Sequence, residues 1–133
     1  MAIRVVQLGT PRDSGEGIRI GTVRRPPRGV RKEDYARLGY YDVWLPQLAP
    51  SARLLSWIKE RSDLAASWKQ FEKLYLRELS SPDNQRLLDL LSLLSRRTDF
   101  SIGCFCEDER VCHRSILRKE LARRGAVIGE GKR

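Results

Sequence analysis

Histidine and cysteine are scarce in this chain of 133 residues, which contains one histidine and three cysteines. Long apolar runs are also missing, since no stretch approaches the roughly 18 apolar residues that a membrane span requires. The N-terminal segment lacks the apolar run that marks a secretory signal. These absences predict a cytoplasmic protein with no membrane partner.

The three cysteines cannot all pair with one another, because their number is odd. The cytoplasm keeps thiols reduced, so structural disulfides are not expected there. All three cysteines lie between Cys104 and Cys112, and the only histidine, His113, follows directly. This clustering favours catalysis or metal binding over a disulfide framework.

Acidic residues are outnumbered by basic ones, 17 to 26, which gives a formal net charge of +9. The excess lies towards the two ends, because the segment 41–109 carries 9 basic and 11 acidic residues. Most of the cations are arginine, which binds phosphate and carboxylate in a bidentate manner. The charge therefore predicts an anionic partner, either a small molecule or a nucleic acid.

Hydrophobic patterning predicts strands near both ends of the chain and helices between and after them. The expected strands are 3–8, 18–23, 40–45, 100–106 and a short last one at 126–128, and the expected helices are 52–61, 63–79, 81–94 and 112–124. This order indicates a single small α/β domain over residues 1–128, with helices packed on a short mixed or parallel sheet. Residues 129–133 are expected to form a basic C-terminal tail.

The cysteine cluster lies where a predicted strand ends and a predicted helix begins. Ligands commonly bind at the carboxyl ends of parallel strands, so this junction is the expected functional site. One interpretation is a metal centre in which Cys104, Cys106, Cys112 and His113 bind zinc or iron, including an iron–sulfur cluster. The spacing differs from the usual Cys-x2-Cys knuckle, and the adjacent ligands at 112 and 113 would have to diverge.

A second interpretation is a reactive thiolate at the N-terminus of the last helix. Unpaired backbone amides and nearby cations would lower the pKa of a cysteine there and also bind an anion. A third interpretation is that the cysteines are small core residues, since free cysteine is often buried. The candidate catalytic residues are Cys104, Cys106, Cys112, His113 and Arg114, and Arg110 and Ser115 are candidate anion-binding residues.

The densest positive segment is 24–32, here called the arginine loop, which contains four arginines, one lysine and two prolines. The prolines oppose regular strand pairing, so the segment is expected to be a loop. We predict that Arg28 and Lys32 hold an anionic group over the cysteine site, the alternative being a solvated loop. Asp42 and Trp44 are supporting candidates, Asp42 to orient an arginine and Trp44 to form core or pocket wall.

Several motifs resemble one protein family. The pattern Cys-x-Cys-x5-Cys-His-Arg-Ser at 104–115 resembles the signature of the domain of unknown function 488 family. The stretches 27–33 and 42–51 and the aromatic spacing of 68–79 are similar to its YeaO-like branch. The resemblance implies a single cytoplasmic α/β domain without implying a particular reaction, and it favours a ligand-binding role for the arginine loop.

The favoured interpretation is an enzyme with a cysteine-centred site, either an activated thiolate or a zinc or iron centre. Its substrate would be an anionic small molecule, such as a phosphorylated one. The alternative is a small basic nucleic-acid-binding module that uses the arginine loop and the last helix. The sequence contains no aromatic-basic sheet motif of the RNA-binding kind and no convincing helix-turn-helix.

Overall fold

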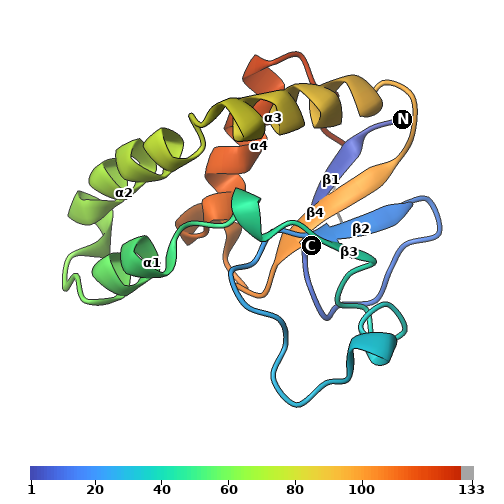
Figure 1. Cartoon of the computed structure of the whole chain (residues 1–133), viewed down its shortest axis with the longest axis horizontal. Helices are drawn as coiled ribbons and strands as arrows, with labels where there is room; N and C mark the ends of the chain where they lie inside the picture. Colours follow the sequence, from blue (N-terminus) through green and yellow to red (C-terminus); the bar gives the residue numbers. More distant parts are fainter. Residues whose placement is uncertain (130–133) are drawn as a thin grey trace.

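A computed structural model describes residues 1–129, and its strands form one four-stranded sheet (Figure 1). The strands are β1 (Ile3–Gln7), β2 (Ile18–Gly21), β3 (Val43–Trp44) and β4 (Phe100–Cys104), in the order β1-β4-β2-β3. Isoleucine and valine recur in β1 and β2, where branched side chains suit a pleated surface. Every strand pair is parallel, so the carboxyl ends of all four strands lie at one edge of the sheet.

Four α-helices complete the α/β fold that the sequence predicts. They are α1 (Ala52–Lys59), α2 (Leu64–Glu78), α3 (Pro82–Leu94) and α4 (His113–Arg123). The first three begin at Ser51, Asp63 and Ser81, whose side chains each accept a backbone N–H of the first turn. Helix α4 ends just before Gly125, whose φ of +91° is a left-handed conformation that favours glycine.

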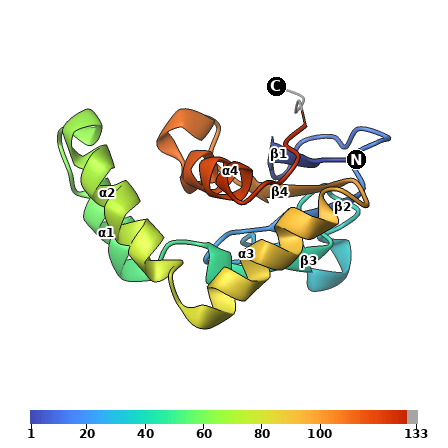
Figure 2. The same ribbon diagram turned by 90° about the horizontal axis from the view of Figure 1, so that it is seen from above.

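The main core lies between the helices and one face of the sheet (Figures 1 and 2). Helices α1 and α2 lie side by side away from the sheet, while α3 and α4 lie closer to it (Figure 2). The backbone N–H and the hydroxyl of Ser51 both donate to the Glu78 carboxylate, which joins the start of α1 to the end of α2. Strand side chains in this core include Ile3, Val5, Ile20 and Ile102, and helical ones include Phe71, Tyr75, Leu88 and Leu117.

Two glycines allow loop residues to approach the other face of the sheet. A Cβ atom at Gly21 would lie 2.4 Å from the ring of Tyr41, and one at Gly103 would lie 2.5 Å from the side chain of Leu8. Such distances are far shorter than van der Waals contact, so any larger residue would displace these side chains. The glycines therefore bring Leu8 and Tyr41 close to the carboxyl edge of β2 and β4.

The structure shortens all of the predicted strands, and the changes at β3 and β4 bear on the site. Strand β4 ends at Cys104, so Cys106 lies beyond the strand predicted for 100–106. The reason is that the backbone hydrogen bonds between β1 and β4 end there. Leu8 N–H donates to Cys104 O at 2.8 Å, but the next carbonyl, that of Phe105, accepts from the Gln7 side chain and not from a backbone N–H of residues 1–129. The strand predicted for 40–45 is reduced to Val43–Trp44, which Pro46 follows at the start of a 3-10 turn.

The C-terminal segment pairs with β1 at a single point. The predicted strand 126–128 contributes one parallel bridge, between Ile3 and Ile128. Residues 130–133, most of the predicted basic tail, lie outside the described residues. Within residues 1–129, none of the helices combines the length and the apolar character that a membrane span needs.

Candidate functional site

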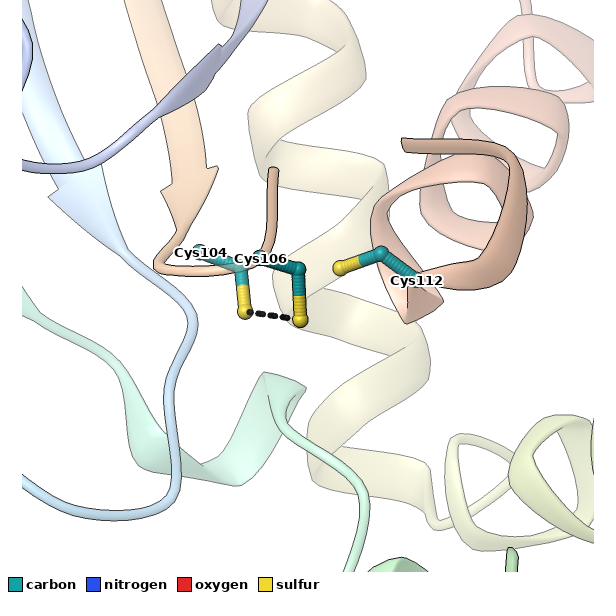
Figure 3. Close-up of side chains that lie close together, drawn as sticks. All are labelled: Cys104, Cys106 and Cys112. Carbon is teal, nitrogen blue, oxygen red and sulfur yellow. Dashed lines mark hydrogen bonds between the residues drawn. The ribbon is translucent and has the colours of Figure 1, made fainter. Parts of the chain in front are cut away.

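The three cysteines converge at the carboxyl edge of the sheet (Figure 3). Cys104 is the last residue of β4, Cys106 lies in the loop that follows, and Cys112 precedes the first turn of α4. The Sγ atoms lie within 4.8 Å of one another, and those of Cys104 and Cys106 are 3.8 Å apart. The predicted site at a strand-to-helix junction is thus a compact group of three free thiols.

The thiols differ in their access to solvent. Cys104 is 8% exposed and Cys112 is 2% exposed, whereas Cys106 is an exposed residue. Leu8, Val23 and Tyr41 pack against the two buried cysteines. A reagent in solution therefore reaches the cluster through Cys106.

His113 borders the cluster without joining the three sulfur atoms. Its Nε2 lies 2.6 Å from the backbone oxygen of Thr22. Because a carbonyl only accepts, Nε2 carries the proton, and Nδ1 faces the Cys112 Sγ at 3.7 Å. The edge of the Tyr75 ring packs on the imidazole, with the two centroids 5.7 Å apart. These contacts fix the orientation of the ring behind Cys112.

Arg114 is buried beneath the cysteine loop, with 3% of its surface exposed. Its guanidinium donates to Val6 O and Cys106 O at 2.6 Å each, and Nε donates to the Cys112 Sγ at 3.4 Å. One side chain therefore joins β1, the loop after β4 and the start of α4. All of these acceptors belong to the protein, so Arg114 holds the site together.

The hydrogen bonds shift the pKa values of the three thiols in different directions. Bonds donated by the Cys104 and Cys112 thiols, together with the charge of Arg114, lower the pKa of Cys106. The same bonding and burial raise the pKa of Cys104. A hydrogen bond from Cys104 and the adjacent His113 lower the pKa of Cys112. The first negative charge of the cluster is therefore centred on the exposed sulfur.

A pocket of about 1030 Å³ lies next to Arg114 and Ser115, and it is lined by cations and acids in similar numbers. Ser115 donates its hydroxyl to Cys112 O at 2.9 Å, within its own helical turn. The other cations of this pocket pair with acids: Arg110 with Asp108, Arg118 with Glu109, and Lys119 with Glu72. These pairs reduce the positive field that an anion would meet there.

A second, smaller pocket collects three of the other predicted residues. Lys32, Asp42 and Trp44 line a volume of about 310 Å³, together with Tyr35 and Tyr41. Asp42 accepts from Arg12 at 2.7 Å, so its arginine partner lies outside the arginine loop. The Trp44 indole donates to Val23 O at 2.7 Å, and no cysteine lines this pocket.

Within residues 1–129, Arg28 and Lys32 are exposed and form no ion pair. Arg24, in contrast, donates to the carbonyl oxygens of Ala49 and Pro50, both at 3.0 Å. The arginine loop leaves the carboxyl end of β2, the strand beside β4, so it starts at the sheet edge that carries the cysteines. Arg25 is likewise exposed and without an ion pair among the described residues, so the loop offers three cations to a ligand.

Sequence reasoning missed Thr22 and gave Tyr75 only a core role. Thr22 follows β2, and its carbonyl fixes the proton of His113 from 91 positions away. Tyr75 donates to Leu48 O at 2.5 Å while its ring supports the imidazole. The spacing of Trp68, Phe71 and Tyr75 was a signal for this helix, but no local pattern indicates which tyrosine meets a histidine.

The sulfur atoms are close enough to bind a metal ion together. Thiolates around a tetrahedral zinc ion, each at about 2.3 Å, lie roughly 3.8 Å apart. The three Sγ atoms lie within 4.8 Å of one another, so small side-chain rotations would suffice. Cys104, Cys106 and Cys112 would supply three ligands to zinc or iron. His113 lies outside this group of three, but its Nδ1 faces the Cys112 Sγ at 3.7 Å while Nε2 donates to Thr22 O, which is the arrangement of a histidine that ligates through Nδ1.

The family model described as the active DUF488-N3 subclade matches residues 3–125. The matched range contains all three cysteines, Arg114, and the segments that line the second pocket. No curated protein and no solved structure matches the chain.

Proposed function

The chain belongs to the DUF488 family, and from this premise we propose that it is an enzyme whose Cys106 thiolate attacks an anionic small molecule. The observation that carries the proposal is that the sulfur of Cys106, an exposed residue, lies beside the thiols of two buried cysteines, with Arg114 fixed beneath them. The description of the matched subclade as active agrees with a catalytic role. Membership of the YeaO-like branch stays a prediction.

Cys106 is the nucleophile in this proposal. Its sulfur forms a bond to an electrophilic carbon or phosphorus atom of the substrate, and the leaving group departs with the electrons of its own bond. The Cys104 thiol donates a hydrogen bond to the attacking sulfur at 3.8 Å. Arg114 is a positioning residue, and His113 with Cys112 holds a proton behind the nucleophile.

We assign the anion-binding role to Arg28 and Lys32. Both are exposed and free of ion pairs in the described part of the chain. An exposed arginine can meet a phosphate or carboxylate with two parallel hydrogen bonds. Arg110 and Ser115 are weaker candidates, because Asp108 already pairs with the first and Cys112 O accepts from the second. We also propose a cytoplasmic location, where the three thiols stay reduced.

Alkylation by iodoacetamide tests the nucleophile. We expect Cys106 to react at pH 7 about tenfold faster than a free cysteine, because more of it is thiolate. Since its pKa is lowered, the rate should stay constant as the pH falls from 9 and decline only below the usual range of a thiol. Peptide mapping identifies the labelled cysteine, and Cys106→Ser should abolish the fast phase. A rate that titrates near pH 8.5 contradicts an activated thiolate.

Two controls separate the parts of the proposal. Inorganic pyrophosphate should slow the alkylation of the wild-type protein, and the protection should weaken in the Arg28→Ala, Lys32→Ala double variant. Elemental analysis of protein purified without oxygen or chelator distinguishes the thiolate from a metal centre. Three free thiols without stoichiometric metal support the thiolate, whereas zinc or iron that disappears in Cys106→Ser would assign the cluster to metal binding.

A further inference from the structure

We propose that the cluster also reduces hydroperoxides, with Cys106 oxidised first and Cys112 then closing an intramolecular disulfide with it. The inference rests on the accessible Cys106 of the proposed function and adds a second activity to that site. Its basis is geometric: one exposed sulfur lies within 4.8 Å of two buried ones (Figure 3). A peroxide in solution meets Cys106 first, and the oxidised sulfur already has thiols beside it.

Cys112 is better placed than Cys104 to close the disulfide. Five residues separate Cys106 from Cys112, which allows an unstrained ring, whereas one residue separates Cys104 from Cys106. The backbone of Cys104 is also fixed in β4, where its carbonyl accepts from Leu8 N–H at 2.8 Å. Bond formation requires two sulfurs to approach to about 2.05 Å, so the pair with the longer intervening chain is favoured.

Polar contacts at Cys112 suit the attacking sulfur. Arg114 Nε donates to the Cys112 Sγ at 3.4 Å, and His113 Nδ1 lies 3.7 Å from the same atom. Arg114 also donates to Cys106 O, so one guanidinium holds both reacting residues. Burial of Cys112, which is 2% exposed, protects it from direct oxidation until Cys106 has reacted.

The two steps balance as follows. The Cys106 thiolate attacks one oxygen of the hydroperoxide, the O–O bond breaks, and the products are a sulfenic acid and an alkoxide that takes up a proton. Cys112 then attacks the Cys106 sulfur, the S–S bond forms, the S–O bond breaks, and hydroxide leaves with the Cys112 proton as water. Two thiols are oxidised and one hydroperoxide is reduced to an alcohol. A small dithiol returns the disulfide to the starting state by exchange.

The masses of tryptic peptides show which cysteines are joined by a disulfide. The chain has arginines at 97, 110 and 114, so digestion places Cys104 and Cys106 in the peptide 98–110 and Cys112 in the peptide 111–114. After one equivalent of hydrogen peroxide, we expect the free thiols of the full chain to fall from three to one. The intact mass should fall by two hydrogen atoms, and peptides 98–110 and 111–114 should appear joined. Dithiothreitol should reverse all three changes.

Single variants, each checked for native circular dichroism, test the roles. Cys104→Ser is the matched control and should still form the disulfide. Cys106→Ser should not join the two peptides. In Cys112→Ser, a second equivalent of hydrogen peroxide should convert Cys106 to sulfinic acid, because Cys104, fixed in β4, does not close the disulfide in its place. A disulfide within peptide 98–110 of the wild-type protein would overturn the role of Cys112. Sulfinic acid or intermolecular dimers as the main wild-type product would overturn the whole inference.

Alkylation of the freshly reduced protein, run in parallel, separates this inference from the proposed function. Fast labelling of Cys106 with no disulfide after peroxide removes only the peroxide activity. Slow labelling with no disulfide removes both proposals.

Discussion

Arg114 determines the shape of the cysteine cluster at the scale of single residues. It is buried, and its donors satisfy the carbonyl oxygens of Val6 and Cys106 as well as the Cys112 sulfur. Buried carbonyls that lose a charged donor are costly, because water cannot replace it. The residue was predicted as catalytic from its place in the motif, and its contacts favour a positioning role.

Replacement of Arg114 by methionine should affect stability and reactivity together. We expect Arg114→Met to lower the free energy of unfolding by about 2–4 kcal/mol, since the buried carbonyl of Val6 and the part-buried carbonyl of Cys106 lose their donor. The charge of Arg114 helps to lower the pKa of Cys106, so that pKa should rise in the variant. Urea denaturation measures the first effect, and the pH dependence of alkylation measures the second.

The control for this variant is Arg97→Met, at an exposed arginine distant in sequence from the cluster. It should change neither the stability nor the alkylation profile. Equal stability of Arg114→Met and the wild-type protein would contradict the positioning role.

At the scale of elements, a buried ion pair joins the β1–β2 loop to the sheet. Arg19 on β2 and Glu16 before it are 0% and 2% exposed, and Arg19 Nε donates to Glu16 at 2.7 Å. Ser101 on β4 also donates to Glu16, and Arg19 donates to the carbonyl oxygens of Thr10 and Gly39. The pair thus fixes two loops against the central strands.

The contribution of the Glu16–Arg19 ion pair to the stability of the fold should depend on pH. Burial alone raises the pKa of Glu16, but hydrogen bonds from Arg19 and Ser101 outweigh it, so the net pKa is lowered. A carboxyl group with a depressed folded-state pKa contributes stability above its unfolded value of about 4.3. That contribution is lost as the pH falls through the folded-state pKa.

We therefore expect Glu16→Gln to lower the free energy of unfolding at pH 7 by about 3–5 kcal/mol, because Arg19 keeps a buried charge without its partner. The difference in stability from the wild-type protein should shrink once the pH falls below the pKa of Glu16 in the folded state. Urea denaturation at pH 7 and at acidic pH measures both effects. Glu60→Gln, at an exposed glutamate, is the control, and a similar loss in both variants would refute the assignment.

At the scale of the whole molecule, local ion pairs neutralise part of the basic charge and leave a net charge of +9. Many arginines are engaged by acids, for example Arg12 by Asp42, Arg118 by Glu109 and Arg124 by Asp89. Arg28 and Lys32 on the arginine loop stand apart from these pairs in the described chain. A nucleic-acid module would need the unpaired cations to form one continuous positive surface.

Titration with nucleic acid tests the alternative function. We expect mixed-sequence RNA and DNA to bind with a Kd no tighter than about 10⁻⁶ M at physiological salt, the range of non-specific association. Affinity should fall steeply as salt rises, because phosphate contacts release counterions. Fluorescence anisotropy over a salt series measures this. Nanomolar binding that persists at high salt would favour the nucleic-acid module over the enzyme.

The sequence alone determined the order of the strands and helices and the clustering of the cysteines between a strand and a helix. Caps and periodicity act within a few residues, so Ser51, Asp63 and Ser81 located the starts of the helices before any fold was known. The clustering of the cysteines at a strand-to-helix junction was likewise a local pattern. The prediction went wrong at Cys106, because the end of β4 depends on where the neighbouring strands end.

Only the tertiary structure decided how the cluster works. Which thiol is exposed, which carbonyl fixes the proton of His113 and which acceptors hold Arg114 all depend on residues far apart in the sequence. Val6, whose oxygen accepts from Arg114, is 108 positions away, and Thr22 is 91 positions from His113. Burial and hydrogen bonding arise only when distant segments pack together, so no local pattern could have supplied them.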